Sequence, residues 1–128
     1  EEDTSLRAAF NAQGLSIIRL ATPTTDDTRL ALVLDGASGF LYYVSVAGVT
    51  GANAATSEAI ESAVARLKRA TELPIAVGFG VREPDAARAI ARHADVVVVG
   101  SALVDEIAAG EPGKAVERVL RKVRLLSE

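Results

Sequence analysis

The sequence predicts an α/β fold in which four short parallel strands alternate with helices. Three observations support this prediction. Short apolar segments rich in β-branched residues alternate with longer segments that repeat apolar residues every three or four positions. Glycine-containing turns follow three of the short segments. The segment 95–99 is almost wholly apolar, as is typical of a strand buried on both faces. Strands that alternate with helices form parallel sheets with right-handed crossovers.

The first half of the chain is expected to hold two helices and two strands. Their ranges are 4–13 (helix), 15–20 (strand), 26–34 (helix) and 40–44 (strand). Thr25 or Asp26 can cap the second helix, because their side chains accept hydrogen bonds from free N–H groups. Tyr42 and Tyr43 alternate across the strand, so only one can face the inside of a closed sheet. The other is expected to pack under the helices.

The second half continues the alternation after a long loop at 45–57. The expected ranges are 58–70 (helix), 75–77 (strand), 84–92 (helix), 95–99 (strand), 102–108 (helix) and 114–126 (helix). A loop of this length in a compact domain is usually functional or mobile. Apolar residues at helical spacing are expected to face inward, namely Ile60, Val64 and Leu67 in one helix and Val116, Val119, Leu120 and Val123 in the last.

Composition excludes several classes of function. A net charge of −3 and only five aromatic residues argue against a nucleic-acid surface. With no cysteine and a single histidine, His93, the chain can form neither a disulfide nor a zinc site built from Cys and His. No apolar run approaches the roughly 20 residues of a membrane helix, and no signal peptide is recognisable. We therefore expect a cytoplasmic protein with no metal and no cofactor.

Three glycine-containing turns, 48–51, 78–80 and 100–101, come directly after strands. The carboxyl ends of parallel strands form the edge at which such sheets bind ligands. Glycine lets the backbone approach an anion closely, and Ser101 opens a helix whose N-terminus carries free N–H groups. A single glycine after a strand usually has only a structural role in the turn. Two together predict that a phosphate lies between the last two turns.

The chain resembles the tryptophan synthase α subunit family along its whole length. The segments that carry the resemblance are Ile18–Thr25 (IRLATPTT), Ser38–Ser45 (SGFLYYVS), Ala47–Gly51 (AGVTG), Leu73–Val81 (LPIAVGFGV) and Val99–Val104 (VGSALV). The resemblance implies half of a (β/α)8 TIM barrel. Residues 1–128 would form a single half-barrel domain that runs from helix four through helix eight of the parent barrel.

The family cleaves indole-3-glycerol phosphate to indole and glyceraldehyde 3-phosphate and works with a β subunit. The resemblance implies that five residues hold the substrate phosphate: Gly51, Phe79, Gly80, Gly100 and Ser101. Leu20, Tyr42 and Thr50 would belong to the substrate pocket. The family's two catalytic carboxylates lie on strand two and the loop after it, in the half of the barrel that this chain lacks. We therefore assign no catalytic residue and expect the isolated chain to be inactive.

Other charged candidates have simpler explanations. Asp26 and Asp27 are expected to be a helix cap and a first-turn acid. Asp95 and His93 lie at the amino-terminal end of the last strand, away from the expected ligand edge. The basic last helix is expected to be a solvated amphipathic helix.

Four strands alone would leave two sheet edges and one apolar face exposed. Three solutions are open: a symmetric homodimer, association with the complementary half-barrel, or rearrangement into a doubly wound, flavodoxin-like layer. Two functions compete. One is the phosphate-binding half of a lyase with a phosphorylated small-molecule substrate. The other is a non-catalytic, self-associating scaffold, excised or designed. A signalling receiver domain is a weaker third, because its strand ends would carry acidic residues.

Overall fold

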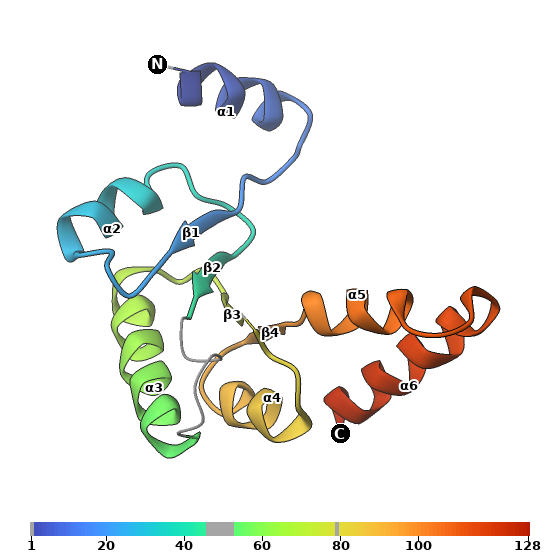
Figure 1. Cartoon of the computed structure of the whole chain (residues 1–128). Coiled ribbons are helices and arrows are strands. Elements are labelled where there is room, and N and C mark those ends of the chain that lie inside the picture. The colour runs from blue at the N-terminus through green and yellow to red at the C-terminus, as the bar shows by residue number, and fades with distance from the viewer. Residues whose placement is uncertain (1, 46–52, 79) are drawn as a thin grey trace.

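A single parallel sheet with helices packed on one of its faces forms the centre of the molecule (Figure 1). The computed structural model describes residues 2–45, 53–78 and 80–128. The strands are β1 (Arg19–Ala21), β2 (Leu41–Val44), β3 (Ile75–Gly78) and β4 (Val96–Val98). They are all parallel and lie in the order β1-β2-β3-β4. This sequential order is that of half a barrel. It excludes the doubly wound alternative, whose strand order reverses at a switch point.

The register of the sheet assigns each strand residue to one of two faces. Leu20, Tyr42, Ala76 and Val96 lie side by side across the four strands. We call the face that they share the inner face, because it corresponds to the inside of a barrel. The residues that follow them alternate to the outer face: Ala21, Tyr43, Val77 and Val97. As predicted, the two tyrosines therefore point to opposite faces.

The helices that connect the strands cover the outer face. They are α2 (Asp27–Leu34), α3 (Asn53–Ala70) and α4 (Pro84–Ala91). Each right-handed crossover leads to the next strand in the same direction, so all three helices lie on one side. The buried core joins outer-face strand residues to the apolar stripes of these helices, including Leu30, Leu41, Tyr43, Ile60, Val64, Leu67, Ile75, Val77 and Ile90. The predicted stripe of α3 is confirmed.

Two element boundaries differ from the prediction by more than two residues, both of them starts. The apolar run at 15–20 forms a strand only at Arg19–Ala21, because its pairing with β2 begins at Leu41. Helix α3 begins at Asn53, five residues before its expected start at 58. Residues 53–57 read Asn-Ala-Ala-Thr-Ser and carry no large apolar side chain, so hydrophobic periodicity could not place them in a helix.

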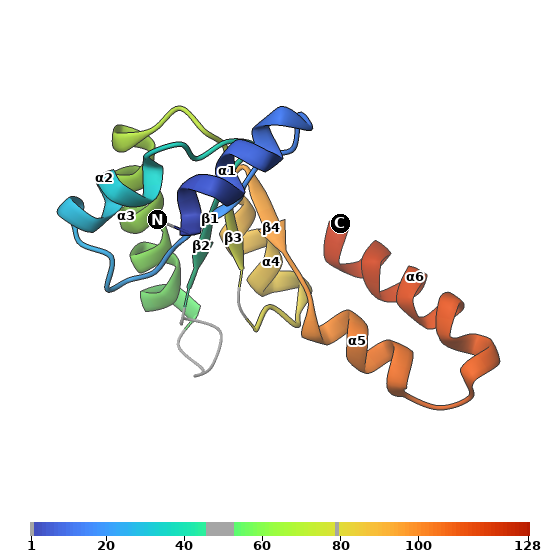
Figure 2. The same ribbon diagram turned by 90° about the horizontal axis from the view of Figure 1, so that it is seen from above.

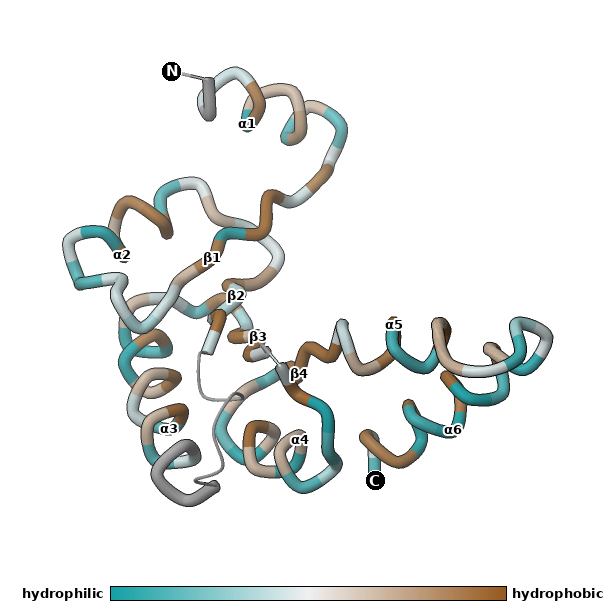
Figure 3. Tube along the Cα trace, viewed as in Figure 1, coloured by the Kyte–Doolittle hydropathy of each residue, from teal (hydrophilic) through white to brown (hydrophobic). Residues whose placement is uncertain are grey.

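The last two helices form a hairpin that extends away from the sheet (Figures 1 and 2). Helix α5 (Ser101–Ala108) leaves β4, and α6 (Ala115–Ser127) returns antiparallel to it after a short 3-10 turn, Pro112–Lys114. The predicted inward face of α6 is largely wrong: Val116 is 72% exposed, and Leu120 and Val123 are exposed as well. Figure 3 shows apolar residues along this helix. The apolar face exists, but among the described elements α6 packs mainly on α4, α5 and the 3-10 turn.

Helix α1 (Glu2–Ala12) stands apart from the sheet in Figure 1. Arg7 ties it to the end of α2. Its guanidinium donates to the carbonyl oxygen of Asp35 over 3.0 Å and to the Asp35 carboxylate over 3.2 Å. The Arg7 side chain lies over Gly36, whose φ of +70° suits glycine. This contact holds the middle of α1 and leaves most of the surface of the helix exposed.

Candidate anion site at the carboxyl edge of the sheet

Two of the predicted phosphate-site residues, Gly80 and Gly100, follow neighbouring strands at the same height. Gly78 pairs with Val98 in the register of β3 and β4. Gly80 and Gly100 each come two residues later, at the carboxyl edge. Gly80 has a φ of +66°, a left-handed conformation that glycine adopts without strain. The structure thus brings the two turns together, because the sheet order makes their strands neighbours.

Helix α5 begins at this edge. Gly100 is its N-cap residue, and no side chain caps the helix there. The N–H groups of Leu103 and Val104 donate to the carbonyl oxygen of Gly100. Gly100 and Ser101 are both exposed, and a Cβ atom added to Gly100 would meet no atom within 4 Å. The start of the helix is therefore open to solvent on the side where its N–H dipoles favour an anion.

The two described pocket residues, Leu20 and Tyr42, are neighbours on the inner face. Leu20 is 54% exposed, while Tyr42 is partly buried. The Tyr42 hydroxyl lies near Gly78: a Cβ atom at Gly78 would come within 3.2 Å of it. The same Cβ would lie only 2.5 Å from the carbonyl oxygen of Val98. The absence of a side chain at Gly78 thus gives room for both Tyr42 and the neighbouring strand.

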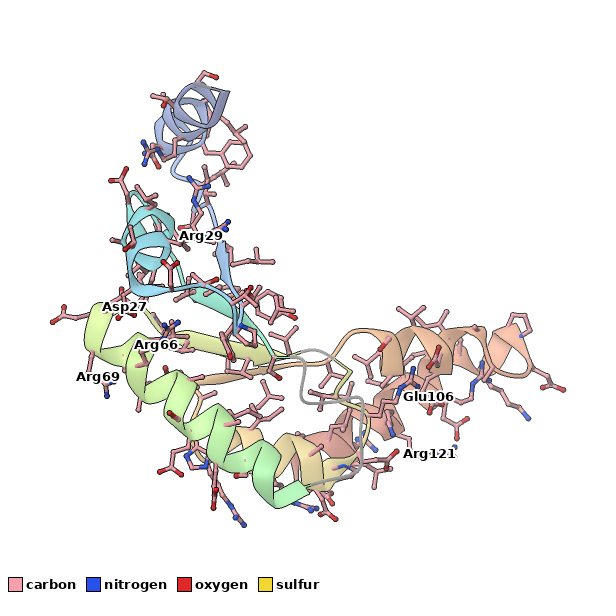
Figure 4. All side chains as sticks on the ribbon, turned by 60° about the vertical axis from the view of Figure 1, so that its left-hand side comes forward. Asp27, Arg29, Arg66, Arg69, Glu106 and Arg121 are labelled. Atoms are coloured by element: carbon pink, nitrogen blue, oxygen red, sulfur yellow. The ribbon has the colours of Figure 1, made fainter. Side chains whose placement is uncertain are left out.

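Tyr43, on the outer face, occupies a different environment. Burial under the helices raises the pKa of its hydroxyl, and the nearby Arg66 opposes this effect. The Arg66 guanidinium donates to the carbonyl oxygen of Thr25 over 2.6 Å and to the Asp27 carboxylate over 3.1 Å. Figure 4 shows Arg66 reaching from α3 toward Asp27 at the start of α2. These contacts join the helices and leave Asp27 with a structural partner.

The other acidic candidates also have structural partners. Asp26 caps α2, accepting a hydrogen bond from the N–H of Arg29 over 2.8 Å, as predicted. Asp95 lies at the opposite end of the sheet and accepts from the N–H of Ile75 and from Lys68, each over 2.9 Å. The hydrogen bond from Ile75, followed by that from Lys68, holds the pKa of the Asp95 carboxyl below its usual value.

His93 follows α4 at the same, amino-terminal end of the sheet, with its Nε2 atom 3.5 Å from the Ser57 hydroxyl. Thr50, Gly51 and Phe79 fall outside the described residues, so their assignments stay predictions.

Within residues 2–45, 53–78 and 80–128, no group of three or more His, Cys, Asp or Glu side chains could hold a metal ion. No helix of that part is long and apolar enough to cross a membrane.

An apolar groove of about 510 Å³ lies on the opposite side of the sheet, beneath α6. It is lined by residues of β4 and the three last α-helices, including Ala87, Val97, Leu103 and Val123. Its outer-face residue Val97 places it away from Tyr42 and the glycine turns. We interpret the groove as the consequence of the incomplete packing of α6 on β4.

Sequence reasoning missed the roles of two residues, one at this edge of the sheet and one at the far end of α5. One is Gly78, assigned only to a turn, whose close contacts depend on a register that the sequence does not reveal. The other is Arg118 in α6. Its guanidinium donates to the carbonyl oxygens of Glu106 (2.9 Å), Glu111 (3.0 Å) and Ile107 (3.5 Å) at the end of α5. The signal available in the sequence was a basic residue that follows a helix and the glycine that ends it.

Comparison with known proteins identifies the family. Residues 1–128 match the family described as tryptophan synthase alpha chain. The chain belongs to this family. Among solved structures, it superposes on a mutant tryptophan synthase alpha-subunit from Pyrococcus furiosus with a TM-score of 0.79 and 34% identity, covering 97% of this chain and 49% of that one. A structure from Aquifex aeolicus superposes with a TM-score of 0.79 and 34% identity, covering 98% of this chain and 45% of that one.

The tryptophan synthase alpha subunit from Campylobacter jejuni has the same fold. Its TM-score is 0.84 at 24% identity, over 98% of this chain and 49% of that one. The chain thus spans about half the length of these family structures. Membership of the tryptophan synthase alpha family and the four-stranded parallel sheet together identify a half-barrel of a tryptophan biosynthesis family, as predicted.

Proposed function

We propose that this chain is the phosphate-binding, C-terminal half of a tryptophan synthase α-type lyase. The lyase would cleave indole-3-glycerol phosphate to indole and glyceraldehyde 3-phosphate. The observation that carries the proposal is the placement of Gly80, Gly100 and the open start of α5 on neighbouring strands. A phosphate at this edge would accept hydrogen bonds from backbone N–H groups without a lysine or arginine.

The inner face supplies the apolar part of the same site. Leu20 and Tyr42 lie one strand apart, and no charged side chain lies beside them in the row that continues through Ala76 to Val96. An indole ring would bury apolar surface there, below a phosphate held at the carboxyl edge. Thr50, Gly51 and Phe79 would complete this arrangement as the resemblance implies.

The chemical step needs groups from outside this chain. Retro-aldol cleavage requires an acid and a base positioned around the indole and the glycerol hydroxyls. The acids described near the carboxyl edge have structural roles. Asp26 caps α2 and Asp27 is a partner of Arg66. Glu83 lies 4.0 Å from Lys122, and Asp85 pairs with Arg88. We therefore assign the chain to substrate binding, and the acid/base pair to the complementary half of the barrel. The β subunit would be the partner of the completed barrel.

Anion binding tests the first part of the proposal. We expect glycerol 3-phosphate, followed by amide chemical shifts, to perturb Gly80, Gly100 and Ser101. Gly100→Ala should weaken binding at least about tenfold, because a methyl group at the N-cap prevents close approach of the anion. The added Cβ atom at residue 100 would meet no protein atom within 4 Å, so the fold should persist. Gly113→Ala is the matched control, since it is equally uncrowded and lies in the 3-10 turn.

Equal affinity in both variants would refute the anion site. Lyase activity tests the second part. The chain alone should release no indole from indole-3-glycerol phosphate, and addition of the N-terminal half of a homologous alpha chain should restore release. Restoration that is unaffected by Gly100→Ala would show that this edge does not hold the substrate.

A further inference from the structure

The turn that follows β1 lies at the carboxyl edge of the sheet, next to the apolar part of the candidate site. It comprises residues 22–25 and begins directly after Ala21, the last residue of the strand. Leu20, on the inner face of the same strand, lies two residues before the turn. A ring that packs on Leu20 near the carboxyl edge therefore has this turn as its neighbour.

Hydrogen bonds close this turn on itself. The N–H of Thr25 donates to the carbonyl oxygen of Thr22 over 3.0 Å. The N–H of Thr22 donates to the Thr25 hydroxyl over 3.0 Å, and the hydroxyls of these two residues lie 3.2 Å apart. Pro23 restricts the backbone between them. The four residues thus form a compact unit, whose position depends on what holds the buried Thr25.

Arg66 of α3 holds this unit from the outer face of the sheet. Its guanidinium donates a short, charge-assisted hydrogen bond of 2.6 Å to the carbonyl oxygen of Thr25. Burial raises the pKa of the Tyr43 hydroxyl, and the charge of Arg66 opposes that rise, so the guanidinium lies near the outer face of β2. Figure 4 shows Arg66 extending from α3 toward the start of α2. The side chain therefore joins α3 to the turn after β1.

The contact with Thr25 differs from an ordinary surface ion pair. The Asp27 side chain is 86% exposed, so its ion pair with Arg66 is expected to contribute little. The carbonyl oxygen of Thr25 instead belongs to a buried residue, and the Arg66 side chain is itself only 33% exposed. Two acceptors in fixed positions suit the planar fork of donors that an arginine provides. The geometry thus favours a role for Arg66 in holding Thr25.

We propose that Arg66 is a positioning residue for the apolar end of the substrate site. By holding Thr25, it sets the distance between the turn after β1 and the inner face at Leu20. This role rests on the proposed function, because it requires that an indole ring packs on Leu20. Arg66 lies behind the sheet and touches no substrate. When Thr25 is released, the turn moves away from Leu20 and the ring loses contacts on one side.

The two ends of the site should respond differently to a change at Arg66. The glycine turns of the candidate anion site follow β3 and β4, whereas Arg66 acts on the turn after β1, and β2 lies between them. Loss of the Arg66 contact should therefore weaken the binding of indole and leave the binding of glycerol 3-phosphate unchanged. A general loss of folded protein would weaken both, since both ends require the folded sheet.

Titration of the chain with indole and, separately, with glycerol 3-phosphate measures the two ends through amide chemical shifts. In Arg66→Met, which keeps the apolar stem, we expect the dissociation constant of indole to rise at least about fivefold, the effect of losing a charged hydrogen bond. The dissociation constant of glycerol 3-phosphate should change less than about twofold, because the sites are separate. Arg66→Lys should give an intermediate affinity for indole, because an ammonium reaches one of the two oxygens.

Two control variants separate the contact with Thr25 from the effect of charge. Arg69→Met removes an exposed guanidinium one turn later on α3. Asp27→Asn removes the ion pair with Arg66 and leaves the Thr25 carbonyl oxygen in place. Both variants should bind indole within about twofold of the parent chain, since exposed charges of this kind contribute little.

A double variant tests whether Arg66 acts through the turn. Thr25→Val removes the hydroxyl that accepts the hydrogen bond from the N–H of Thr22, so it loosens the turn from within. If Arg66 acts through the turn, adding Arg66→Met to Thr25→Val should weaken indole binding by less than about twofold more. Full additivity of the two effects would contradict the proposed route.

Hydrogen exchange provides a check that needs no ligand. The amides of Thr22 and Thr25 should exchange faster in Arg66→Met, whereas those of β3 should not. Unchanged exchange at the turn would overturn the role of Arg66, and so would faster exchange with an unchanged affinity for indole. An equal loss of affinity for both ligands would overturn it too.

The parent chain separates this role from the proposed function. If it binds glycerol 3-phosphate at Gly100 but shows no indole binding, the role of Arg66 is wrong and the anion site stands. If it binds neither ligand, the proposed function is wrong, and the role of Arg66 falls with it.

Discussion

Gly78 shows how a single residue joins the fold to the site. It lies at the end of a central strand, where the backbone of β4 and the Tyr42 hydroxyl both approach its Cα atom. Its φ is not in the left-handed region, so the requirement is for space and not for backbone freedom. The same lack of a side chain allows Tyr42 to lie over the strand that leads to the Gly80 turn.

We expect Gly78→Ala to destabilise the chain by about 1–3 kcal/mol, the usual effect of forcing an extra carbon into a packed interior. The added Cβ would lie 2.5 Å from the Val98 carbonyl oxygen and 2.8 Å from the Val98 Cβ. Denaturant unfolding measures the change, with Gly113→Ala as the uncrowded control. Adding Tyr42→Phe should not restore stability, because the closest contacts are with Val98. Full rescue by Tyr42→Phe would show that the tyrosine contact dominates.

At the scale of the element, sequence alone located every strand and every α-helix of the described residues, although not all of their boundaries. It succeeded because the β-branched runs and the apolar stripe of α3 are properties of the segments themselves. The sequence also predicted that the turns of Gly80 and Gly100 lie close together, since sequential parallel strands place their carboxyl ends at one edge. The start of α3 was missed because residues 53–57 have no apolar period. The exposure of α6 was missed because burial depends on neighbouring elements, whereas an amphipathic pattern only identifies the face.

The α5–α6 hairpin is held together by Arg118, whose three carbonyl contacts lie at and just after the end of α5. Helix C-termini carry unpaired carbonyl groups and partial negative charge, so a guanidinium there stabilises the helix. Because α5 begins at the candidate anion site, Arg118 fixes the far end of the element that supplies it. Its role is therefore to position α5.

We predict that Arg118→Lys lowers the free energy of unfolding by about 1 kcal/mol, since an ammonium keeps the charge but cannot span the same carbonyl groups. Amide hydrogen exchange should speed up in α5 more than in α3. Arg121→Lys is the control, because Arg121 forms an exposed pair with Glu117 one turn away and should change stability by less than about 0.5 kcal/mol. Figure 4 shows Arg121 on the same hairpin as Glu106. Equal effects of the two substitutions would contradict the positioning role.

At the scale of the whole molecule, the helices form one hydrophobic core with the outer face of the sheet. No helix among the described residues covers the inner face. The inner row from Leu20 to Val96 is half-exposed at both ends and buried only at its centre, where Ala76 lies. Stability should therefore be linked to association: whatever covers this face binds the folded chain and not the unfolded one. For the complementary half of the barrel proposed above, the melting temperature then depends on the concentration of that half.

We expect the melting temperature to rise by about 5 °C for each tenfold increase in the concentration of the N-terminal half of a homologous alpha chain, the shift that linkage gives for a domain of this size. Val96→Lys should abolish the dependence, because it places an ammonium group inside the closed barrel, although the half-exposed site tolerates it in a single chain. Leu32→Lys is the control: Leu32 is 74% exposed on α2, in the helical layer of the outer face, so the dependence of this variant should match that of the parent chain. If Leu32→Lys abolishes the dependence and Val96→Lys preserves it, the association uses the helical face. The inner face is then not the surface through which the chain pairs.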